Sequence, residues 1–242
     1  MQFNSVTIII GATDETDSLH KTVDYVMQNC DSDDIGEVLM IHSEDASDGC
    51  RKTMSELESL YPGKVFAMQQ IRDGVGGAIQ DGFDVAQSSH VMILPSDLAI
   101  GLDCVPEMIR RAKLKPEVIS KTSRWANKDS FHNYSGVRKT FNGLSQIFLG
   151  ILYGNTLTDY TNPVQIAPTE IYTGSVWKEL SFPFLLEMVI VPLRRGYTFE
   201  EFAVECYGRK EGKSKNSAIK TAMYLKPALR VRFTPRKKLR RG

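Results

Sequence analysis

The sequence predicts an α/β fold, an open and mostly parallel sheet with helices on both faces. Short apolar runs alternate along the chain with apolar residues at helical spacing, which is the pattern of repeated strand–helix units. Acidic or glycine-rich segments follow several of the runs, as expected for loops at the carboxyl ends of parallel strands. With 242 residues, 42% of them apolar, the chain can bury a large core.

Six apolar runs are predicted strands. They are residues 6–10, 37–42, 64–68, 91–94, 117–120 and 198–204. The first five are nearly continuous in apolar character, which favours parallel strands covered on both faces.

Helices are predicted between and after these strands. Their apolar faces are Leu19, Val23, Val26 and Cys30; the small residues Ala78, Gly82 and Ala86; Val105, Met108, Ile109 and Ala112; and a stripe from Phe141 to Leu152. Residues 153–165 are polar and rich in turn residues. A helix within residues 181–197 is expected to be perturbed or ended near Pro192. One more helix is predicted at residues 218–225, and the tail from Lys226 is predicted to be loosely held.

Several classes of protein are excluded by composition. The N-terminus has no basic region before its first strand, so no signal peptide is predicted, and no apolar run reaches the roughly 18 residues of a membrane span. The four cysteines, Cys30, Cys50, Cys104 and Cys206, lack CxxC spacing and are interpreted as thiols of a reducing cytosol. The four histidines are scattered, so a structural zinc site is not expected.

The net charge of +1 hides an asymmetry between the body and the C-terminus. Residues 213–242 hold eleven lysines and arginines and no acid, which leaves 19 basic and 29 acidic residues before them. Such a basic end suggests an anionic partner, for example a membrane surface, although a solvated, frayed terminus is the plainer explanation. Because the cations of the tail are not interleaved with aromatic residues beyond Phe233, no nucleic-acid partner is expected.

Three segments are candidates for chemistry. Acids follow the predicted strands, namely Asp14, Glu15, Glu44, Asp45, Asp73 and Asp97, and such a cluster favours a cation or a hydrogen-bonding ligand. Taken singly, Asp14 and Asp48 could instead be helix caps and the others solvated loop acids. The segment "RDGVGGAIQDG" suits a backbone that approaches a ligand closely, and "GRKEGKSK" suits a donor-rich loop that closes on phosphate oxygens.

Together and in this order, these segments resemble the inverting family 2 glycosyltransferases of GT-A fold, including dolichyl- and polyprenyl-phosphate sugar synthases. The resemblance spans residues 5–216 and is carried by "VTIIIGATDET", "HSEDASDGC", "RDGVGGAIQDGFDVA", "LPSDL", "TSRW", "DYTNPVQ" and the closing helix, strand and "RKEGKSK" loop. It implies one domain at residues 1–218, with a nucleotide-binding half at 1–120 and an acceptor-side half at 121–218. Residues 219–242 would be a C-terminal helix and basic tail.

The chain departs from the family pattern at its metal motif. Pro95 stands where the family has the first acid of its DxD, Asp97 remains, and Ala99 replaces a further polar ligand. Ser43 and Glu44 stand where the family has the two acids that contact the nucleotide base. Gln165 stands where the family has an arginine. One carboxylate can hold Mg²⁺ or Mn²⁺ when a diphosphate and waters fill the other positions. The ion is therefore expected to be held weakly without the donor, with Asp97 as its protein ligand.

The resemblance implies roles for further residues. The expected donor-binding residues are Ala12, Asp14, Glu15, Ser43, Glu44, Asp73, Gly76, Ser96 and Asp97. The expected ligands of phosphate or acceptor are Arg124, Arg138, Arg209, Ser214 and Lys215, although an ion pair is an equal reading of the first two. Asp159 is the expected catalytic carboxylate, with Glu187 second, if the acceptor is a hydroxyl; a phosphate acceptor needs no base.

The predicted function is transfer of a sugar, in the manner of a hexosyltransferase, from a nucleotide diphosphate to a glycan or a polyprenyl phosphate. The implied setting is polysaccharide or glycolipid synthesis in the cytoplasm, at the inner face of the membrane if the basic tail binds there. A non-catalytic relative that acts as a binding or assembly subunit is the alternative, because Pro95, Ala99 and Ser43 weaken the metal site. A nucleotidyltransferase is disfavoured, since "GATDET" after the first strand contains no cation.

Overall fold

A computed structural model describes residues 2–127, 129–132, 136–207 and 223–241. It contains one seven-stranded sheet with strand order β3-β2-β1-β4-β6-β5-β7. The strands are β1 (Val6–Ala12), β2 (Ile35–His42), β3 (Val65–Gln69), β4 (His90–Ile93), β5 (Ile119–Ser123), β6 (Gln165–Pro168) and β7 (Phe199–Ala203). All neighbours pair in parallel except β6, which is antiparallel to both β4 and β5. The predicted mostly parallel open sheet is confirmed.

The centre of the sheet is built on β1, which pairs with β2 on one side and β4 on the other. Successive residues of a strand face opposite sides. Ile8 and Ile10 pack with the core on one face of the sheet, and Ile9 packs with the core on the other. Because both faces are covered, the run stays apolar without alternation, which is the signal that predicted this strand.

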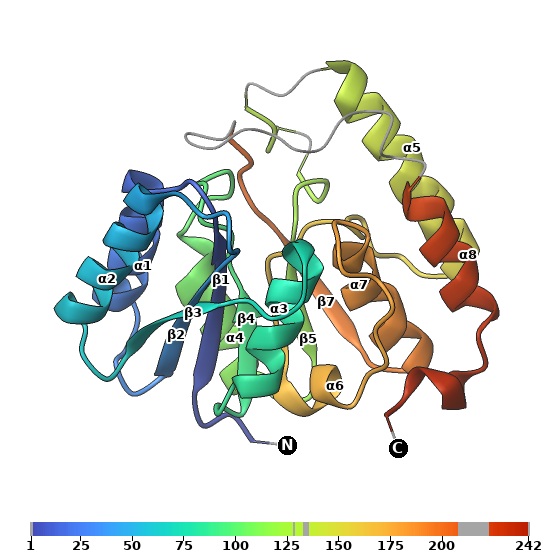
Figure 1. The fold of residues 1–242 in the computed structure, drawn as a ribbon. Coiled ribbons are helices and arrows are strands. Elements are labelled where there is room, and N and C mark those ends of the chain that lie inside the picture. The colour runs from blue at the N-terminus through green and yellow to red at the C-terminus, as the bar shows by residue number, and fades with distance from the viewer. Residues whose placement is uncertain (1, 128, 133–135, 208–222, 242) are drawn as a thin grey trace.

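Helices cover both faces of the sheet (Figure 1). The core of one face includes residues of α1 (Asp17–Asn29), α2 (Asp48–Leu60) and α4 (Cys104–Leu114). The core of the other includes residues of α3 (Gly74–Val85), α6 (Thr169–Thr173) and α7 (Phe184–Arg195). Two further helices, α5 (Gly136–Tyr153) and α8 (Leu225–Phe233), lie beside each other and share a third core cluster with α7 (Figure 1).

Among the elements that precede α8, three are missing from the predicted set, namely α2, α6 and β6. The last of these begins at Gln165, the end of the segment read as polar and turn-rich, and its four residues are too few to show a period. The helix expected to end near Pro192 continues to Arg195, and Gly196 closes it with a left-handed φ of 97°. The suggested caps are also displaced: α1 follows Thr16 and α2 follows Ser47, whose side chain accepts the N–H of Cys50.

The prediction of a loosely held tail from Lys226 is wrong. In α8, Ala228 and Val231 are buried, and Leu239 is buried in the short helix η2 (Arg236–Leu239) that follows. These side chains form one cluster with Leu186 and Ile190 of α7. The basic composition of this segment conceals an apolar stripe, because the arginines and lysines occupy the positions between the buried ones. The helix predicted at residues 218–225 lies mostly outside the described residues.

The docking of this segment predicts a stability effect near the end of the chain. Leu239→Ala removes a buried side chain and leaves a cavity, so the free energy of unfolding should fall by about 2–4 kcal/mol. Leu229→Ala, at a side chain that is 38% exposed, should change it by less than about 1 kcal/mol. Urea unfolding followed by circular dichroism measures both, and equal effects would contradict a packed C-terminal segment.

Candidate functional site

The candidate site lies at the carboxyl ends of β1 and β4, which are neighbours in the sheet. Beyond the last paired residue, the N–H of Leu94 still donates to the carbonyl of Ile9 at 3.0 Å, and the Ser96 hydroxyl donates to the carbonyl of Gly11 at 2.8 Å. These bonds keep the segments that follow β1 and β4 together as they leave the sheet. Ser96 therefore has a bonded structural role at the predicted donor site.

Asp97 follows immediately and is held at this edge. Its side chain is 7% exposed, and its Oδ1 accepts the N–H of Ala99 at 3.0 Å. Between them, Leu98 has a φ of 54°, a left-handed conformation that is uncommon outside glycine. Such a conformation is held only when its surroundings demand it, and here it belongs to the turn that the hydrogen bond between Ala99 and Asp97 closes.

The loops after β1 and β2 meet beside this edge. The N–H of Ser47 donates to the carbonyl of Thr13 at 2.8 Å, which joins the two loops. The Glu15 carboxylate folds back and accepts the N–H groups of Thr13 and Asp14 at 2.9 and 3.2 Å. The predicted donor residues Ala12, Asp14, Glu15, Ser43, Glu44, Ser96 and Asp97 thus lie on or beside loops at one edge of the sheet.

The glycine segment has a packing role that its sequence does not reveal. A Cβ at Gly76 would stand 2.5 Å from the Cβ of Phe184, the first residue of α7. The N–H of Gly77 donates to the carbonyl of Leu180 at 3.0 Å. The close approach inferred from these glycines is therefore made, among the described residues, to the segment before α7. Asp73 stands at the N-cap of α3 with no side-chain cap bond, and it is exposed.

Arg124 and Asp159 form a buried ion pair. Arg124 donates Nε to Oδ2 at 2.7 Å and one terminal nitrogen to Oδ1 at 2.9 Å, and Asp159 is completely buried. The same carboxylate accepts the N–H groups of Arg124, Thr161 and Asn162. Burial alone would raise the pKa of Asp159, but Arg124, aided by Lys121, outweighs it and lowers the pKa to about 2.

A second layer of charge supports this pair. Glu201 of β7 accepts the N–H groups of Thr158 and Asp159 at 2.6 and 3.0 Å. Lys121 of β5 is fully buried, donates to the carbonyls of Thr122 and Asp159, and lies 4.0 Å from Glu201. Burial lowers the pKa of Lys121, and the two acids partly offset this. The sequence interpretation missed Lys121 and Glu201, although a lone lysine inside a strand run is a signal for a buried partner.

Gln165 takes its place in the same layer. It pairs in register with both Ile93 and Lys121, it is completely buried, and its amide atoms have no hydrogen-bond partner among the described residues. An arginine at this position would place two buried cations side by side, which repel each other. The departure from the family pattern at Gln165 is therefore compatible with the presence of Lys121.

Glu187 lies elsewhere, inside the α7–α8 contact. One oxygen accepts the N–H groups of Lys178 and Glu179 at 3.0 and 2.9 Å, and the other pairs with Arg230 of α8. Burial raises the pKa of Glu187, and these donors only partly offset it. Arg230 also pairs with Glu179 at 2.7 Å. A role for the C-terminal segment in neutralising Glu187 is not readable from the sequence.

A short segment after β7 crosses back to the Asp97 loop. The N–H of Tyr207 donates to the carbonyl of Ala99 at 2.8 Å, and the N–H of Gly101 donates to the carbonyl of Glu205 at 3.1 Å. The basic loop begins directly after this segment. Its predicted residues Arg209, Ser214 and Lys215 lie outside the described residues, and so does the side chain of Arg138, which is placed on α5.

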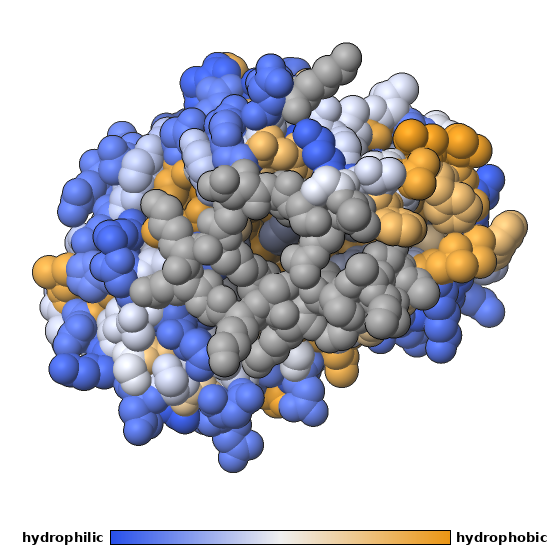
Figure 2. Space-filling model, turned by 90° about the horizontal axis from the view of Figure 1, so that it is seen from above, coloured by the Kyte–Doolittle hydropathy of each residue, from blue (hydrophilic) through white to orange (hydrophobic). Residues whose placement is uncertain are grey.

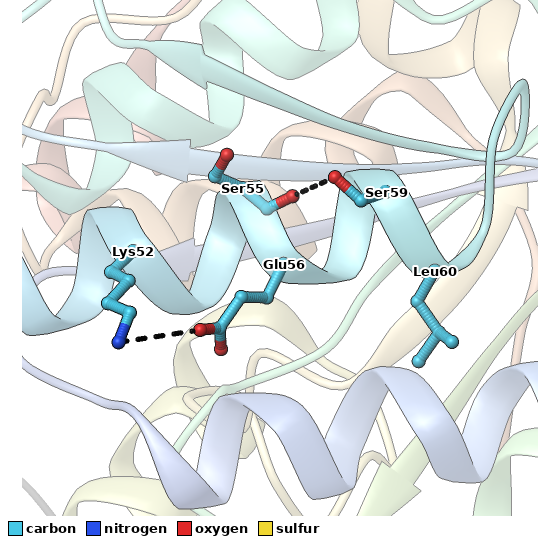
Figure 3. Close-up of a pocket in the computed structure, with 5 residues that line it drawn as sticks. All are labelled: Lys52, Ser55, Glu56, Ser59 and Leu60. Atoms are coloured by element: carbon cyan, nitrogen blue, oxygen red, sulfur yellow. Dashed lines mark hydrogen bonds and ion pairs between the residues drawn. The ribbon is translucent and has the colours of Figure 1, made fainter.

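No group of three or more potential metal-ligating side chains occurs in the described parts of the chain. A depression of about 460 Å³ is lined by Lys52, Ser55, Glu56, Ser59 and Leu60 (Figure 3). All five belong to α2, where Lys52 pairs with Glu56 and the Ser59 hydroxyl donates to the carbonyl of Ser55. It is a groove between side chains of one helix and lies apart from the strand-end residues.

Residues 7–172 match the protein family described as glycosyl transferase family 2. A curated relative is the undecaprenyl-phosphate 4-deoxy-4-formamido-L-arabinose transferase of Proteus mirabilis (strain HI4320), 24% identical over 160 residues. The match covers 66% of this chain and 47% of that protein, so the chain spans about half the length of this relative.

Solved structures of similar fold include glucosyl-3-phosphoglycerate synthase from Mycobacterium tuberculosis. Its complex with Mn²⁺, UDP and phosphoglyceric acid has a TM-score of 0.73 at 12% identity, covering 96% of this chain and 80% of that one. Its complex with Mg²⁺ and UDP gives the same values. At this identity the likeness establishes the fold, which is that of the predicted GT-A class.

The Arg124–Asp159 pair predicts a specific dependence of stability on acid. Because the pKa of Asp159 is lowered in the folded protein, its contribution of about 2 kcal/mol is present above pH 4 and is lost as the pH falls toward 2. Asp159→Asn should cost about 3–5 kcal/mol at neutral pH, since Arg124 and Lys121 lose their anion. Its stability should then fall less steeply below pH 4.

Denaturant titrations at several pH values measure both effects. Asp129→Asn, at an exposed acid, is the matched control and should follow the unaltered protein at every pH. Parallel pH profiles for the unaltered protein and Asp159→Asn would contradict the assigned role of this pair.

Proposed function

The chain belongs to glycosyl transferase family 2, and on this premise we propose that it transfers a sugar from a nucleotide-diphosphate donor to an acceptor, with inversion at the anomeric carbon. The observation that carries the proposal is the edge formed by β1 and β4, where Ser96 and Asp97 stand beside the loops after β1 and β2. In open α/β sheets, ligands bind outside the carboxyl ends of the strands.

We assign the donor to this edge. Asp14, Glu15, Ser43 and Glu44 offer hydroxyl and carboxylate groups, of the kind that hydrogen-bond a base and a ribose. Asp73 is exposed at the start of α3 and is a candidate for the same ligand. Gly76 contributes to this arrangement through the packing of α3 against α7.

Asp97 is the candidate ligand for Mg²⁺ or Mn²⁺. A single carboxylate fits an ion that the donor's diphosphate also binds, and it does not fit a site that holds the ion alone. When bound, the ion would neutralise charge on the leaving diphosphate. The hydrogen bonds from Ala99 to Asp97 and from Ser96 to Gly11 hold this segment and support the assignment. The sequence of the basic segment that follows Tyr207 offers further cations for a diphosphate.

The burial and pairing of the two predicted bases favour an anionic acceptor. A general base at neutral pH needs a pKa near 7 and access to the proton that it removes. Asp159 is buried and paired with a pKa of about 2, and Glu187 is buried against Arg230 and two backbone N–H groups. A phosphate oxygen is already anionic and needs no base, so we favour a phosphate acceptor such as a polyprenyl phosphate.

The setting that we propose is the cytoplasm. Cys30, Cys50, Cys104 and Cys206 are all free thiols, and three of them are buried. The C-terminal cations fit an anionic surface. None of the helices in the described ranges has the length and apolar character required to cross a bilayer.

The donor site can be tested by isothermal titration of nucleotide sugars with and without Mn²⁺. Asp97→Asn keeps the shape of the side chain but removes the charge. The factor by which Mn²⁺ increases the affinity for the donor should therefore fall at least about tenfold. Asp33→Asn, an exposed acid on the loop before β2, should leave it unchanged. Donor binding that is independent of both Mn²⁺ and Asp97 would contradict the metal assignment, and no donor binding at all would favour a non-catalytic subunit.

The acceptor class can be tested by transfer from a radiolabelled nucleotide sugar. Product should form with a polyprenyl phosphate and not with the corresponding polyprenol. The rate should rise as the acceptor phosphate loses its second proton near pH 6 and then remain level, because transfer to a phosphate requires no protein base. Efficient transfer to the free alcohol, or a rate that follows a further group near pH 7, would contradict a phosphate acceptor.

A further inference from the structure

Two neighbouring helices present large apolar side chains to solvent. On α5 these are Phe141, Leu144, Ile147, Phe148 and Ile151, and on α8 they are Leu225, Leu229 and Phe233. Their exposed fractions run from 38% at Leu229 to 78% at Ile151. We call this set the α5–α8 apolar surface. Figure 2 shows apolar side chains gathered on the side of the molecule where α5 and α8 lie.

These side chains are not the core-facing residues of their helices. Leu149 of α5, and Ala228 and Val231 of α8, already fill that role against α7. The exposed residues follow helical spacing of their own, three and four residues apart along α5 and four apart along α8. Each helix therefore has a second apolar face, which the described residues leave uncovered. Single exposed apolar residues are ordinary, but a contiguous set marks an interaction surface.

The segments that carry this surface, namely α5, α8 and the residues that follow to Arg241, are basic and contain no acid of their own; Arg241, at the far end, pairs with Asp84 of α3 at 3.4 Å. Lys226, Arg236, Lys237, Lys238, Arg240 and Arg241 are exposed at the C-terminal end of the chain. The guanidinium of Arg232 lies 6.0 Å from the ring of Phe233, which joins the cations to the apolar set. The acids that Arg230 binds, Glu179 and Glu187, are held on the α7 side of α8.

The combination of exposed apolar residues and cations indicates which partner covers this surface. A second copy of the chain would bring two pairs of basic helices without acids of their own together, and their charges would repel. A bilayer with anionic headgroups satisfies both parts, because apolar side chains enter the acyl boundary while lysines and arginines meet the phosphates. Each helix packs one face against the protein and exposes a narrow apolar face. Such helices suit lying in the plane of the membrane–water interface and not crossing the bilayer.

We propose that the α5–α8 apolar surface binds the face of an anionic lipid bilayer, with both helices lying along it. Binding through this surface does not depend on the identity of donor or acceptor. The point of contact is then two packed helices, whose apolar residues enter the membrane and whose cations set the preference for anionic lipid, and not the basic tail alone as the sequence suggests.

Vesicle co-sedimentation of the full chain tests this surface. Neutral phosphatidylcholine vesicles are compared with vesicles containing about 30% phosphatidylglycerol. The unaltered protein should bind the anionic vesicles, and its partition coefficient should fall with added salt but remain measurable. The double variant Ile147→Glu with Ile151→Glu should lower partitioning at least about tenfold, because two carboxylates would enter the bilayer boundary.

Ile71→Glu with Leu114→Glu is the matched control. These side chains are 87% and 66% exposed and lie off both helices, so the same change in charge and apolarity should alter partitioning less than about twofold. Thermal unfolding of both variants confirms that they fold. Equal losses in the two variants, or no binding of the unaltered protein to anionic vesicles, would overturn the proposal.

Sedimentation velocity without lipid tests whether a second copy of the chain covers this surface instead. The unaltered protein should be monomeric, or any association should be unchanged in the double variant. A dimer that Ile147→Glu with Ile151→Glu dissociates would overturn the proposal in favour of a second copy. Donor binding, measured in the same preparations, should be unaffected by either variant, so failure of the membrane proposal is separable from failure of the proposed function.

Discussion

The second half of the molecule depends on the buried contact between Arg124 and Asp159. β5 leads into Arg124, the loop before β6 carries Asp159, and β7 supplies Glu201, whose carboxylate holds the backbone of that same loop. Lys121 completes the set from inside β5. These charges would be costly alone, and each is compensated by another or by backbone donors. The network therefore fixes how β6 inserts, antiparallel, between β4 and β5, beside the edge that carries Asp97.

The C-terminal segment is part of the same structure rather than an appendage. Arg230 neutralises Glu187 from outside, while Ala228, Val231 and Leu239 cover the apolar side of α7. Since α7 also packs against Gly76 at the start of α3, the end of the chain supports the helix that borders the strand-end site. The uncovered face of α8 then lies next to that of α5, so one segment contributes both to the core and to the proposed membrane contact.

Much of the candidate site could be predicted because the carboxyl ends of parallel strands meet at one edge. Asp14, Glu15, Ser43, Glu44, Ser96 and Asp97 followed predicted strands, and their loops lie together in the structure. The roles proposed for Asp159 and Glu187 remain predictions; the structure assigns ion pairs and backbone hydrogen bonds to both. Those partners come from distant positions, Arg124 and Arg230, and no local spacing indicates which cation a buried acid will meet.

By itself the sequence determined the fold class, the succession of the main strands along the chain and the edge at which polar residues collect. These follow from strand and helix periods, which are local properties of the chain. Only the tertiary structure decided that Lys121 and Glu201 support Asp159, that Gly76 serves close packing against Phe184, and that a lysine- and arginine-rich end is a docked helix. Each of these is a contact between residues far apart in the chain, and its energy depends on burial, which arises only when the elements pack.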